Sequence, residues 1–546
     1  MKYGYYFTIA LLSLLVLSAC EKNELYPQTY ITPDYVYNKL DSSGDYALQV
    51  LNNLYSYLPD GYNRIDHVVL GAATDDAISS DNYDHIQTLS QSILTAVADN
   101  PDGVWYTAYQ AVRNVNLYLA HVDNVPIDET TKRYWKAEAR FIRAINYFEL
   151  IKRYGGVPLV GDKLFSQDDE VNIPRNTYQE CVDYIVGELD AIKDSLRPDP
   201  LTATDLGRIS KGADMALKSR VLLYAASPLN NPTDDLSKWQ AAEDAAKDLI
   251  DYHQFSLVPD FTSIFVDRQN SGVILAYQRA QTKDLETQNA PVGYSEPNQS
   301  QGYVSPTQEL VDAFPMDNGM AIADPVSGYD PDHPYQNRDP RLGATVFYNG
   351  SEWLQRTVET FEGGRDKPNS VQRQTRTGYY MRKFLADYST QQAYGNQNHN
   401  FVIFRYGEVL LNDAEAANEL GQTQTAYDQL KRIRERAGIK PGPGGNYGLK
   451  ENMSQTEMRA AIHLERRIEM AFEEQRFWDV RRWKRADAVF NETLHGVKIT
   501  QHATGEFSYQ TVPVFKLTFA PKMYLYPIPF TEISANHAIV QNPGWQ

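Results

Sequence analysis

The stretch Tyr134–Val160, "YWKAEARFIRAINYFELIKRYGGVPLV", decides the fold class of this chain. Phe141, Ile145 and Phe148 recur four and three positions apart, a spacing that places apolar side chains on one face of an α-helix. Two glycines end the pattern, and Pro158 follows directly. The stretch therefore predicts a long amphipathic helix.

The same period recurs in two blocks of the chain. The first block, from about residue 45 to 253, also contains "DMALKSRVLLYAAS" and "WQAAEDAAKDLIDYH". The second begins near "YGEVLLNDAEAANELG" and continues through "TAYDQLKRIRERAG" and "TEMRAAIHLERRIEMAFEEQRFWDVRRW". Helices joined by short turns with Gly or Pro predict stacked helix pairs of the tetratricopeptide kind, although the consensus of that repeat is not met.

Between the blocks, from about residue 255 to 400, helical periods are short and Gly, Pro, Asn, Gln and Tyr cluster. "SGVILAYQ" predicts a strand, and "NAPVGYSEPNQSQGYVSP" predicts a long exposed loop, which is more often functional than accidental. Near the C-terminus, "EFSYQTVPVFKLTF" and "MYLYPIP" predict strands, with a turn at "HATGE". We expect a mostly α fold of stacked tetratricopeptide-like helix pairs, with a loop-rich central segment and small β elements.

The N-terminal apolar run ends at a cysteine. The run from Phe7 to Ala19 is shorter than the roughly 20 residues that cross a bilayer, and Lys2 precedes it. This layout predicts a secretory signal peptide. "LSAC" resembles the bacterial lipobox, which implies that Cys20 becomes the first residue and carries lipid that anchors the protein.

These observations divide the chain into five parts. They are a signal peptide at 1–19, a lipidated tether at 20–42, a first helical part at 43–254, a loop-rich ligand-binding segment at 255–400, and a second helical part with C-terminal β elements at 401–546.

Composition restricts the function classes. With 70 acidic and 52 basic residues, the formal net charge is -18, which disfavours a nucleic-acid partner because phosphates require a basic surface. The only other cysteine, Cys181, lies at helical spacing among apolar residues and predicts a buried thiol without a disulfide framework.

Paired carboxylates carry little catalytic signal here. They are Asp75–Asp76, Asp168–Asp169 and Glu473–Glu474. A glycosidase needs two carboxyls on either side of a bond, and sequence neighbours on a helix do not face one another. Because Arg466, Arg467 and Arg476 surround the last pair, we expect an ion-pair network within a helix there. We predict no enzyme.

No metal or cofactor site is predicted either. The sequence has no HExxH, no clustered Cys/His set, and no GxSxG, Walker A or dinucleotide fingerprint. Asp330, Asp332 and Asp339 offer oxygen ligands that could hold calcium, but they lack EF-hand spacing, and a turn-rich loop is the favoured interpretation.

Several segments, in order along nearly the whole mature chain, resemble the SusD/RagB family of surface lipoproteins from the Bacteroidetes. They are "AEARFIRAINYFELIKRYGGVPLV", "NRDPRLGATVFYNG", "YYMRKFLAD", "FRYGEVLLNDAEAANEL", "LKRIRERAGI", "HLERRIEMAFEEQRFWDVRRWK" and "LYPIPFTEISANHAIVQNPGW". The resemblance implies a protein that sits at the cell surface over a SusC-like TonB-dependent outer-membrane transporter. It would capture oligosaccharides, or peptides in the RagB branch, and deliver them to the pore. A helical glycoside hydrolase and a pure interaction scaffold remain the alternatives of other classes.

The resemblance places ligand contacts in variable loops, so the site is predicted from residue chemistry. We expect two loops to converge, with Trp353 as a third wall. The loop residues are Asp81, Asn82, Tyr83 and His85 from the first, and Tyr294, Asn298, Gln299 and Tyr303 from the second. Aromatic rings pack on the C–H faces of sugars, and Asn, Asp and Gln side chains bind hydroxyls. Alternatively, Tyr294 and Tyr303 merely pack the loop onto the scaffold.

A second group of aromatic and basic residues, of types that also occur in ligand sites, consists of Trp478, Arg481 and Trp483. Their position in an arginine-rich helix favours packing and ion pairing instead.

Overall fold

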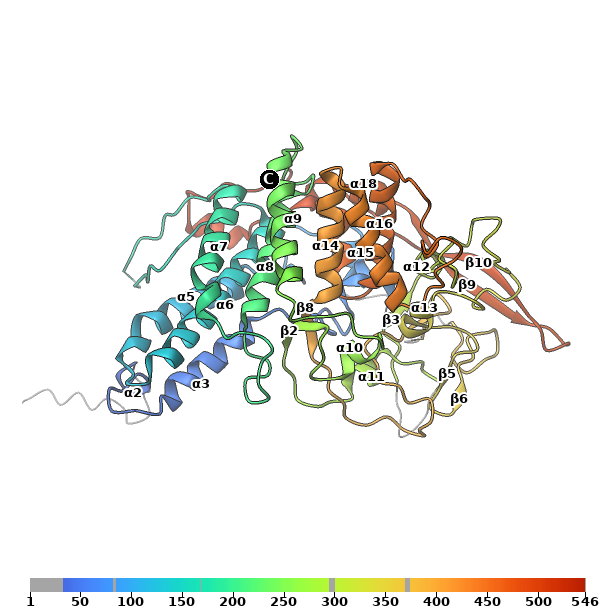
Figure 1. Cartoon of the computed structure of the whole chain (residues 1–546), viewed down its shortest axis with the longest axis horizontal. Coiled ribbons are helices and arrows are strands. Elements are labelled where there is room, and N and C mark those ends of the chain that lie inside the picture. Colours follow the sequence, from blue (N-terminus) through green and yellow to red (C-terminus); the bar gives the residue numbers. More distant parts are fainter. Residues whose placement is uncertain (1–32, 82–84, 167, 294–299, 369–373, 546) are drawn as a thin grey trace, which may run out of the picture.

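The computed structural model describes residues 33–81, 85–166, 168–293, 300–368 and 374–545. It confirms a mostly helical protein with small sheets, in which the helices stand side by side and the loop-rich segment lies against one end of the stack (Figure 1). Cys20 lies outside the described residues. Across the described ranges, none of the helices combines the length and apolarity that crossing a membrane requires.

The first helical block confirms the predicted helices. Its members are α3 (Asp45–Leu54), α5 (Trp105–His121), α6 (Glu129–Tyr154), α7 (Tyr178–Ile192), α8 (Lys211–Ala226) and α9 (Leu236–Asp251). From α5 to α9 each helix packs on the next. The decisive stretch forms α6, which begins after Asp128, whose side chain accepts from the Thr131 N–H, and ends at Gly155 with φ 74°. Cys181 is a buried free thiol, as predicted.

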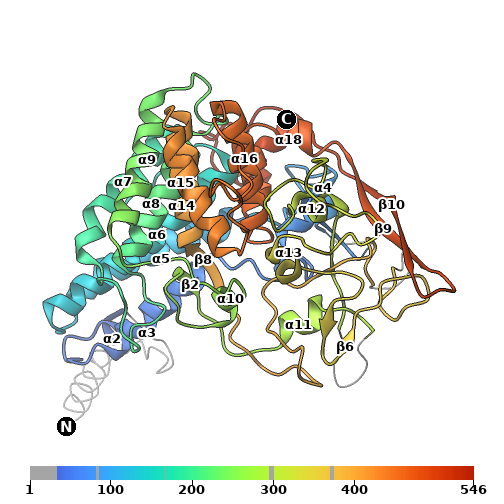
Figure 2. The same cartoon turned by 45° about the vertical axis from the view of Figure 1, so that its right-hand side comes forward.

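The second block continues the same stack. It comprises α14 (Tyr406–Glu419), α15 (Thr423–Arg436), α16 (Gln455–Glu469) and α17 (Gln475–Arg482). α14 packs against α9 as well as against α15 and α16, so two blocks far apart in sequence form one layer of helices (Figures 1 and 2). This arrangement agrees with the predicted tetratricopeptide-like stacking.

The central segment and the remaining parts consist of short elements. The helices are α2 (Pro33–Val36), α4 (Gln87–Ser90), α10 (Ser263–Val266), α11 (Asp284–Asn289), α12 (Gln308–Ala313), α13 (Pro340–Thr345), α18 (Ala486–Val489) and α19 (Phe530–Ala535). The 3-10 turns are η1 (Tyr55–Tyr57), η2 (Leu70–Ala73), η3 (Val122–Asn124), η4 (Lys193–Ser195) and η5 (Pro521–Tyr524).

All of the described strands pair antiparallel in twos. The pairs are β1 (Ala77–Ser79) with β3 (Val304–Pro306), β2 (Val273–Tyr277) with β8 (Phe401–Arg405), β4 (Val346–Phe347) with β7 (Tyr380–Met381), β5 (Glu352–Trp353) with β6 (Arg356–Thr357), and β9 (Thr493–Gln501) with β10 (Phe507–Lys516). The strands predicted in "SGVILAYQ" and "EFSYQTVPVFKLTF" are confirmed, as is the turn at "HATGE", which joins β9 to β10 in the long hairpin of Figure 2.

Two local predictions are wrong. The stretch "TEMRAAIHLERRIEMAFEEQRFWDVRRW" is two helices, because the chain leaves α16 after Glu469 and turns through Phe472 and Glu474, whose φ angles are 65° and 60°. "MYLYPIP" is not a strand. It contains the end of η5, and the Tyr526 N–H then donates to the carbonyl of Arg153 at the end of α6 (2.7 Å), so the segment is fixed to a helix rather than to a sheet.

Buried charges join the central segment to the helical stack. We call the following set the buried ion-pair network: Arg341, Lys383, Arg405, Glu465, Glu469 and Glu473. Arg405 lies 2.7 Å from Glu469 and 2.6 Å from Glu473. Since a buried charge without a partner costs several kcal/mol, these side chains fix one another's positions. The expected ion pairs of Glu473 and Glu474 are confirmed, but the two residues lie in the turn between helices and pair with Arg405 and Arg64.

The tryptophans and arginines in α17 and at the residue that follows it are scaffold. Trp478, Arg481 and Trp483 are buried, as the packing interpretation predicted. Arg482 pairs with Glu415 (2.5 Å). Arg481, by contrast, makes no ion pair with a described residue; its guanidinium lies 3.4 Å from the ring centre of Phe477, and burial lowers its pKa to about 10.

Candidate ligand-binding face

The two predicted binding loops leave the same end of one small sheet. In the β1–β3 pair, Ser79 lies opposite Val304. Just beyond this pair, the Ser80 N–H donates to the carbonyl of Tyr303 (2.8 Å), and the Ser80 hydroxyl donates to the carbonyl of Gly302 (2.5 Å). Asp81 follows Ser80 directly, so the beginning of the first loop lies beside the end of the second. We call residues 79–81 and 302–305 the β1–β3 junction.

The structure places four of the nine predicted ligand residues. Asp81 is half-buried, and its N–H donates to the Ser79 hydroxyl (3.0 Å). His85 is exposed; its N–H donates to Asp66 (2.7 Å), and its ring Nδ1 lies 2.7 Å from the same carboxylate. Tyr303 is 5% exposed, and its ring stacks on His67 with centroids 4.9 Å apart. Asn82, Tyr83, Tyr294, Asn298 and Gln299 lie outside the described residues.

The fourth residue, Trp353, is a core residue rather than a third wall. Its side chain is 0% exposed and packs against Phe347, Tyr388 and Tyr394, with ring centroids 5.3 to 6.0 Å away. Side chains alternate along a strand, and in β5 Glu352 points outward while Trp353 points inward. Its indole therefore presents no surface to a ligand in this structure.

Sequence reasoning missed three residues near the junction. Asp66 and His67 both have left-handed backbones, with φ 46° and 73°, which bring Asp66 to His85 and His67 onto Tyr303. The Arg376 N–H donates to the Ser305 hydroxyl (3.1 Å), and its side chain reaches the carbonyl of Ser79 (3.4 Å). The Asp-His pair between apolar residues was the available signal, because Asp and His tolerate such backbones in turns. The surroundings of the junction thus combine carboxylate, imidazole and guanidinium groups, while the Tyr303 ring is part of the hydrophobic core.

The Asp75–Asp76 pair, which precedes β1, is held in ion pairs with two arginines. Asp75 lies 2.8 Å from Arg476, and Asp76 lies 2.7 Å from Arg467. Burial alone would raise the pKa of Asp75, but the guanidinium groups of Arg467 and Arg476 outweigh it and lower the pKa to about 2. An ionised carboxylate held between two arginines cannot donate a proton to a leaving group, so Asp75 ties β1 to α16 and α17.

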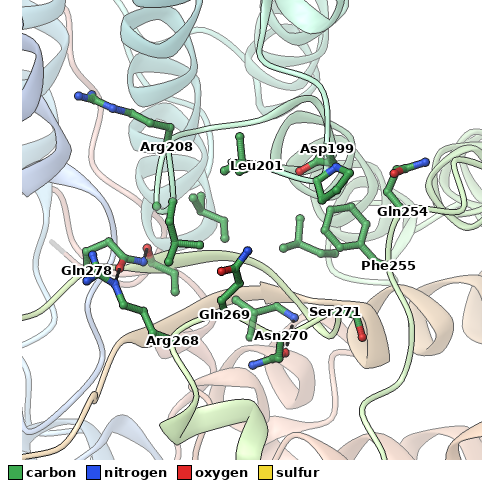
Figure 3. A pocket seen from close by; sticks show the side chains of 17 residues that line it. Asp199, Leu201, Arg208, Gln254, Phe255, Arg268, Gln269, Asn270, Ser271 and Gln278 are labelled. Atoms are coloured by element: carbon green, nitrogen blue, oxygen red, sulfur yellow. Dashed lines mark hydrogen bonds between the residues drawn. The ribbon is translucent and has the colours of Figure 1, made fainter. Parts of the chain in front are cut away.

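A separate pocket of about 280 Å³ lies over β2 and shares no residue with the junction (Figure 3). Figure 3 shows Arg268 and Gln278 at one end and Asp199 with Phe255 at the other. Among the described residues that line it, Asp199 is the only carboxylate, and it accepts from the Gly212 N–H (2.7 Å). This pocket therefore lacks the two facing carboxyls that glycosidic hydrolysis needs.

Comparison with known proteins agrees with this architecture. Residues 265–545 match a family described as "SusD family", and residues 40–223 match one described as "Starch-binding associating with outer membrane". A curated relative, SusD-like protein P2 of Formosa agariphila, is 28% identical over 450 residues, which cover 81% of this chain and 80% of the relative.

Solved structures show the same fold over nearly the whole chain. A SusD-like protein from Bacteroides fragilis has a TM-score of 0.78 and 28% identity, covering 93% of this chain and 98% of that one. A second B. fragilis protein, described as a SusD-like carbohydrate binding protein, has a TM-score of 0.75 and 24% identity, covering 91% and 99%. More than half of the sequence matches the first family, and the helical stack and small sheets are those of its solved structures: the chain belongs to the SusD family.

Proposed function

We propose that this protein is a cell-surface lipoprotein that captures oligosaccharides at the β1–β3 junction and delivers them to a SusC-like TonB-dependent transporter. Lipid on Cys20 would hold it at the outer membrane. Membership of the SusD family supports this proposal, as do the description of one matched family as starch-binding at the outer membrane and of one relative as carbohydrate binding. Tethering would keep the binding domain at a high effective concentration beside the transporter.

The observation that supports the proposal is that the described ends of the two loops lie side by side. Ser80 and Tyr303 are hydrogen-bonded neighbours, so Asp81, which follows Ser80, lies beside the segment that ends the second loop. In our proposal Asn82, Tyr83, Tyr294, Asn298 and Gln299 extend from these ends and supply rings and amides to a sugar. Each hydrogen bond nets only about 1 kcal/mol against water, so the aromatic rings would contribute much of the affinity.

We also propose binding without turnover. The neighbouring carboxylates that could suggest hydrolysis are engaged with cations: Asp75 and Asp76 with Arg476 and Arg467, and Glu473 with Arg405. A general acid must hold a proton near neutral pH, and for Asp75 and Glu473 the arginines outweigh burial and lower the pKa.

The test is incubation of residues 21–546 with a panel of oligosaccharides and short peptides, scored for both retention and products. We expect a glycan to be retained unchanged. Selective retention of peptides would favour a peptide-binding protein of the RagB kind, new products would favour a glycoside hydrolase, and retention of nothing would favour an interaction scaffold.

The anchor is tested separately. We expect Cys20→Ala to leave the outer-membrane fraction while the retained glycan still binds the purified variant. If Cys20→Ala fractionates with the outer membrane as wild type does, the lipid-anchor proposal is wrong.

A further inference from the structure

The pocket over β2 continues at one end into a second pocket of about 380 Å³, which we call the η1–β2 groove. Arg208, Arg268 and Gln278 line both pockets, and Figure 3 shows these three side chains at the same end of the first one. Gly207 allows the close packing there, because its φ is 90° and a side-chain carbon at this position would lie 2.5 Å from Cγ of Gln278. The groove has the size of a small-molecule site.

The lining of the η1–β2 groove is cationic although the protein as a whole is strongly acidic. The chain has a formal net charge of -18, yet the described lining of the groove includes two arginines and no carboxylate. Its other polar side chains are amides and hydroxyls, which belong to Asn52, Tyr55, Ser56, Tyr277 and Gln278. A cleft lined by charge of one sign concentrates ligands of the opposite sign. The groove therefore favours an anionic ligand that also carries hydrogen-bonding groups.

Arg268 supplies a guanidinium that the described part of the chain does not neutralise. Its side chain is exposed and makes no ion pair with a described residue. Its Nε donates to Oε1 of Gln278 (3.3 Å), and this oxygen also accepts from the Asn400 amide (3.0 Å). The Gln278 amide in turn donates to the carbonyl of Ala276 (3.2 Å). Gln278 is thus held in place and orients the guanidinium, whose terminal nitrogens can bind a carboxylate or a sulfate through two parallel hydrogen bonds.

Arg208 supplies the second guanidinium, and buried contacts fix its position. It pairs with Glu138 (3.3 Å), which is 0% exposed, and it lies 5.3 Å from the ring centre of Tyr55. The Tyr55 hydroxyl donates to Glu138 as well (2.7 Å). The Arg208 side chain remains 20% exposed. It is therefore a positioned cation with a part of its surface available to a ligand.

We propose that the η1–β2 groove is a second ligand site, which binds an acidic saccharide. Its carboxylate or sulfate group would lie against Arg268 and Arg208, and its hydroxyls would bond to the amides and hydroxyls of the lining. The side chains of Asn52 and Tyr277 suit this second task, since neither has a hydrogen-bond partner within the described ranges. The groove shares no residue with the β1–β3 junction. That a saccharide carries the anion rests on the proposed function, whereas the anion site rests on the residues named here.

The test is a calorimetric titration of the full-length lipoprotein in detergent with three disaccharides. One contains a uronic acid, one carries a single sulfate, and one is their neutral counterpart. We expect at least one of the two acidic disaccharides to bind about tenfold more tightly than the neutral one, because hydrogen bonds between charged groups are stronger than neutral ones. This affinity should fall as the salt concentration is raised.

Three variants locate the binding. Arg268→Gln should weaken binding of the acidic disaccharide about tenfold, since it removes the charge and keeps a polar side chain. Asn52→Asp should weaken it as well, because the new carboxylate would repel the anion. Arg485→Gln is the matched control: Arg485 is exposed, follows α17 and makes no ion pair in the described part of the chain, so this variant should bind like wild type.

Each variant must keep the wild-type melting temperature. If Arg268→Gln binds the acidic disaccharides as tightly as wild type, or if wild type binds neither of them better than the neutral one, the groove proposal is wrong. If inorganic sulfate displaces the sulfated disaccharide at equal concentration, the groove binds an adventitious ion only and the proposal falls.

The junction variant Asp81→Ala/Tyr294→Ala separates this proposal from the proposed function. If it loses the acidic disaccharide while Arg268→Gln keeps it, the acid binds at the junction, so the second site falls and the proposed function stands. If the panel retains no glycan but acidic disaccharides still bind in a way that depends on Arg268, the groove stands and capture at the junction falls.

Discussion

The buried ion-pair network and the β1–β3 junction are built from similar polar residues but differ in what those residues contact. In the network, Glu469 is almost fully buried and pairs with Arg341 (2.9 Å) and Arg405 (2.7 Å), which are almost fully buried as well. Beside the junction, His67 and His85 are exposed, although His85 is paired with Asp66. The charges of the network are buried and paired with one another, whereas the polar side chains around the junction are half-buried or exposed.

This difference explains why a segment that carries the resemblance to the family does not contain the proposed site. The segment "HLERRIEMAFEEQRFWDVRRWK" supplies Glu465, Glu469 and Glu473 to the network, and Arg467 and Arg476 to the aspartates below β1. Its residue types are required by burial, since each buried charge needs a specific partner. Ligand selectivity can vary in the loops without disturbing that scaffold.

The largest expected effect follows from breaking the network. Glu469 accepts hydrogen bonds from Arg341 (2.9 Å) and Arg405 (2.7 Å), and although burial opposes ionisation, these arginines and Arg436 hold its pKa well below the usual range. Glu469→Gln would leave buried guanidinium groups without their counter-charge, so we expect a loss of about 3–5 kcal/mol in the free energy of unfolding, measured by urea denaturation.

The matched control for that variant is Lys450→Ala, which removes an exposed ion pair with Glu457 and should leave the urea midpoint close to that of wild type. Equal effects of the two substitutions would contradict the scaffold role of the network.

Substitution of Trp353 tests whether this residue belongs to the buried scaffold or to the ligand-binding face. Because its indole is fully buried against Phe347, Tyr388 and Tyr394, Trp353→Ala should create a cavity and cost about 3–5 kcal/mol. Thermal unfolding measures this loss, and Trp353→Phe should recover part of it. A Trp353→Ala protein with wild-type stability but weakened glycan binding would restore the original ligand assignment.

A smaller effect comes from a buried carboxyl in the scaffold. Neither oxygen of Asp214 on α8 has a hydrogen-bond partner in the described part of the chain, and burial, with Asp190 nearby and only partial compensation from Lys218 and Lys193, raises its pKa to about 8. In the unfolded chain the pKa is about 3.9, so between pH 4 and pH 8 the native state binds the extra proton and stability falls as pH rises.

Asp214→Asn cannot titrate and should lose this slope. Relative to wild type, its free energy of unfolding should rise by about 1–3 kcal/mol between pH 5 and pH 7, since one proton contributes at most about 1.4 kcal/mol per pH unit. Parallel stability profiles for the two proteins from urea denaturation at each pH would show that Asp214 is ionised in the folded state.

The smallest effect on stability is expected at the junction. His67 is exposed and stacks on Tyr303, so His67→Ala should change stability by no more than about 1 kcal/mol while weakening glycan binding severalfold. Thermal unfolding and a glycan titration on the same preparation measure both quantities. A large stability loss with unchanged affinity would place His67 in the scaffold.

The sequence predicted the helical stack well because its signals are local. α6 and α8 follow from apolar spacing and from the residues at the helix ends. The break after Glu469 was not predictable in this way, because the turn forms where Glu473 and Glu474 reach Arg405 and Arg64, which lie far away in sequence. Trp353 was misassigned for the same reason: a tryptophan in a polar segment gives no local sign that Tyr388 and Tyr394 cover it.

The sequence predicts that the two loops converge, and the structure places their described ends side by side; the residues that contact those ends were not predictable. The contact of Asp66 with His85 and that of His67 with Tyr303 depend on two consecutive left-handed backbone conformations. The position of Arg376 depends on a hydrogen bond to Ser305, which the β1–β3 pairing creates. Such contacts are set by tertiary structure.

The most direct test of the central claim is a calorimetric titration of the retained oligosaccharide into wild type, the Asp81→Ala/Tyr294→Ala double variant and Tyr46→Ala. Tyr46 is a 41% exposed tyrosine on α3 and serves as the matched control. Loss of one hydrogen bond and one stacking ring should weaken binding by about 1.5–2.5 kcal/mol, at least tenfold, with the melting temperature unchanged. Tyr46→Ala should bind like wild type. A double variant that folds normally and binds as tightly as wild type would contradict the assignment of the β1–β3 junction as the ligand-binding face.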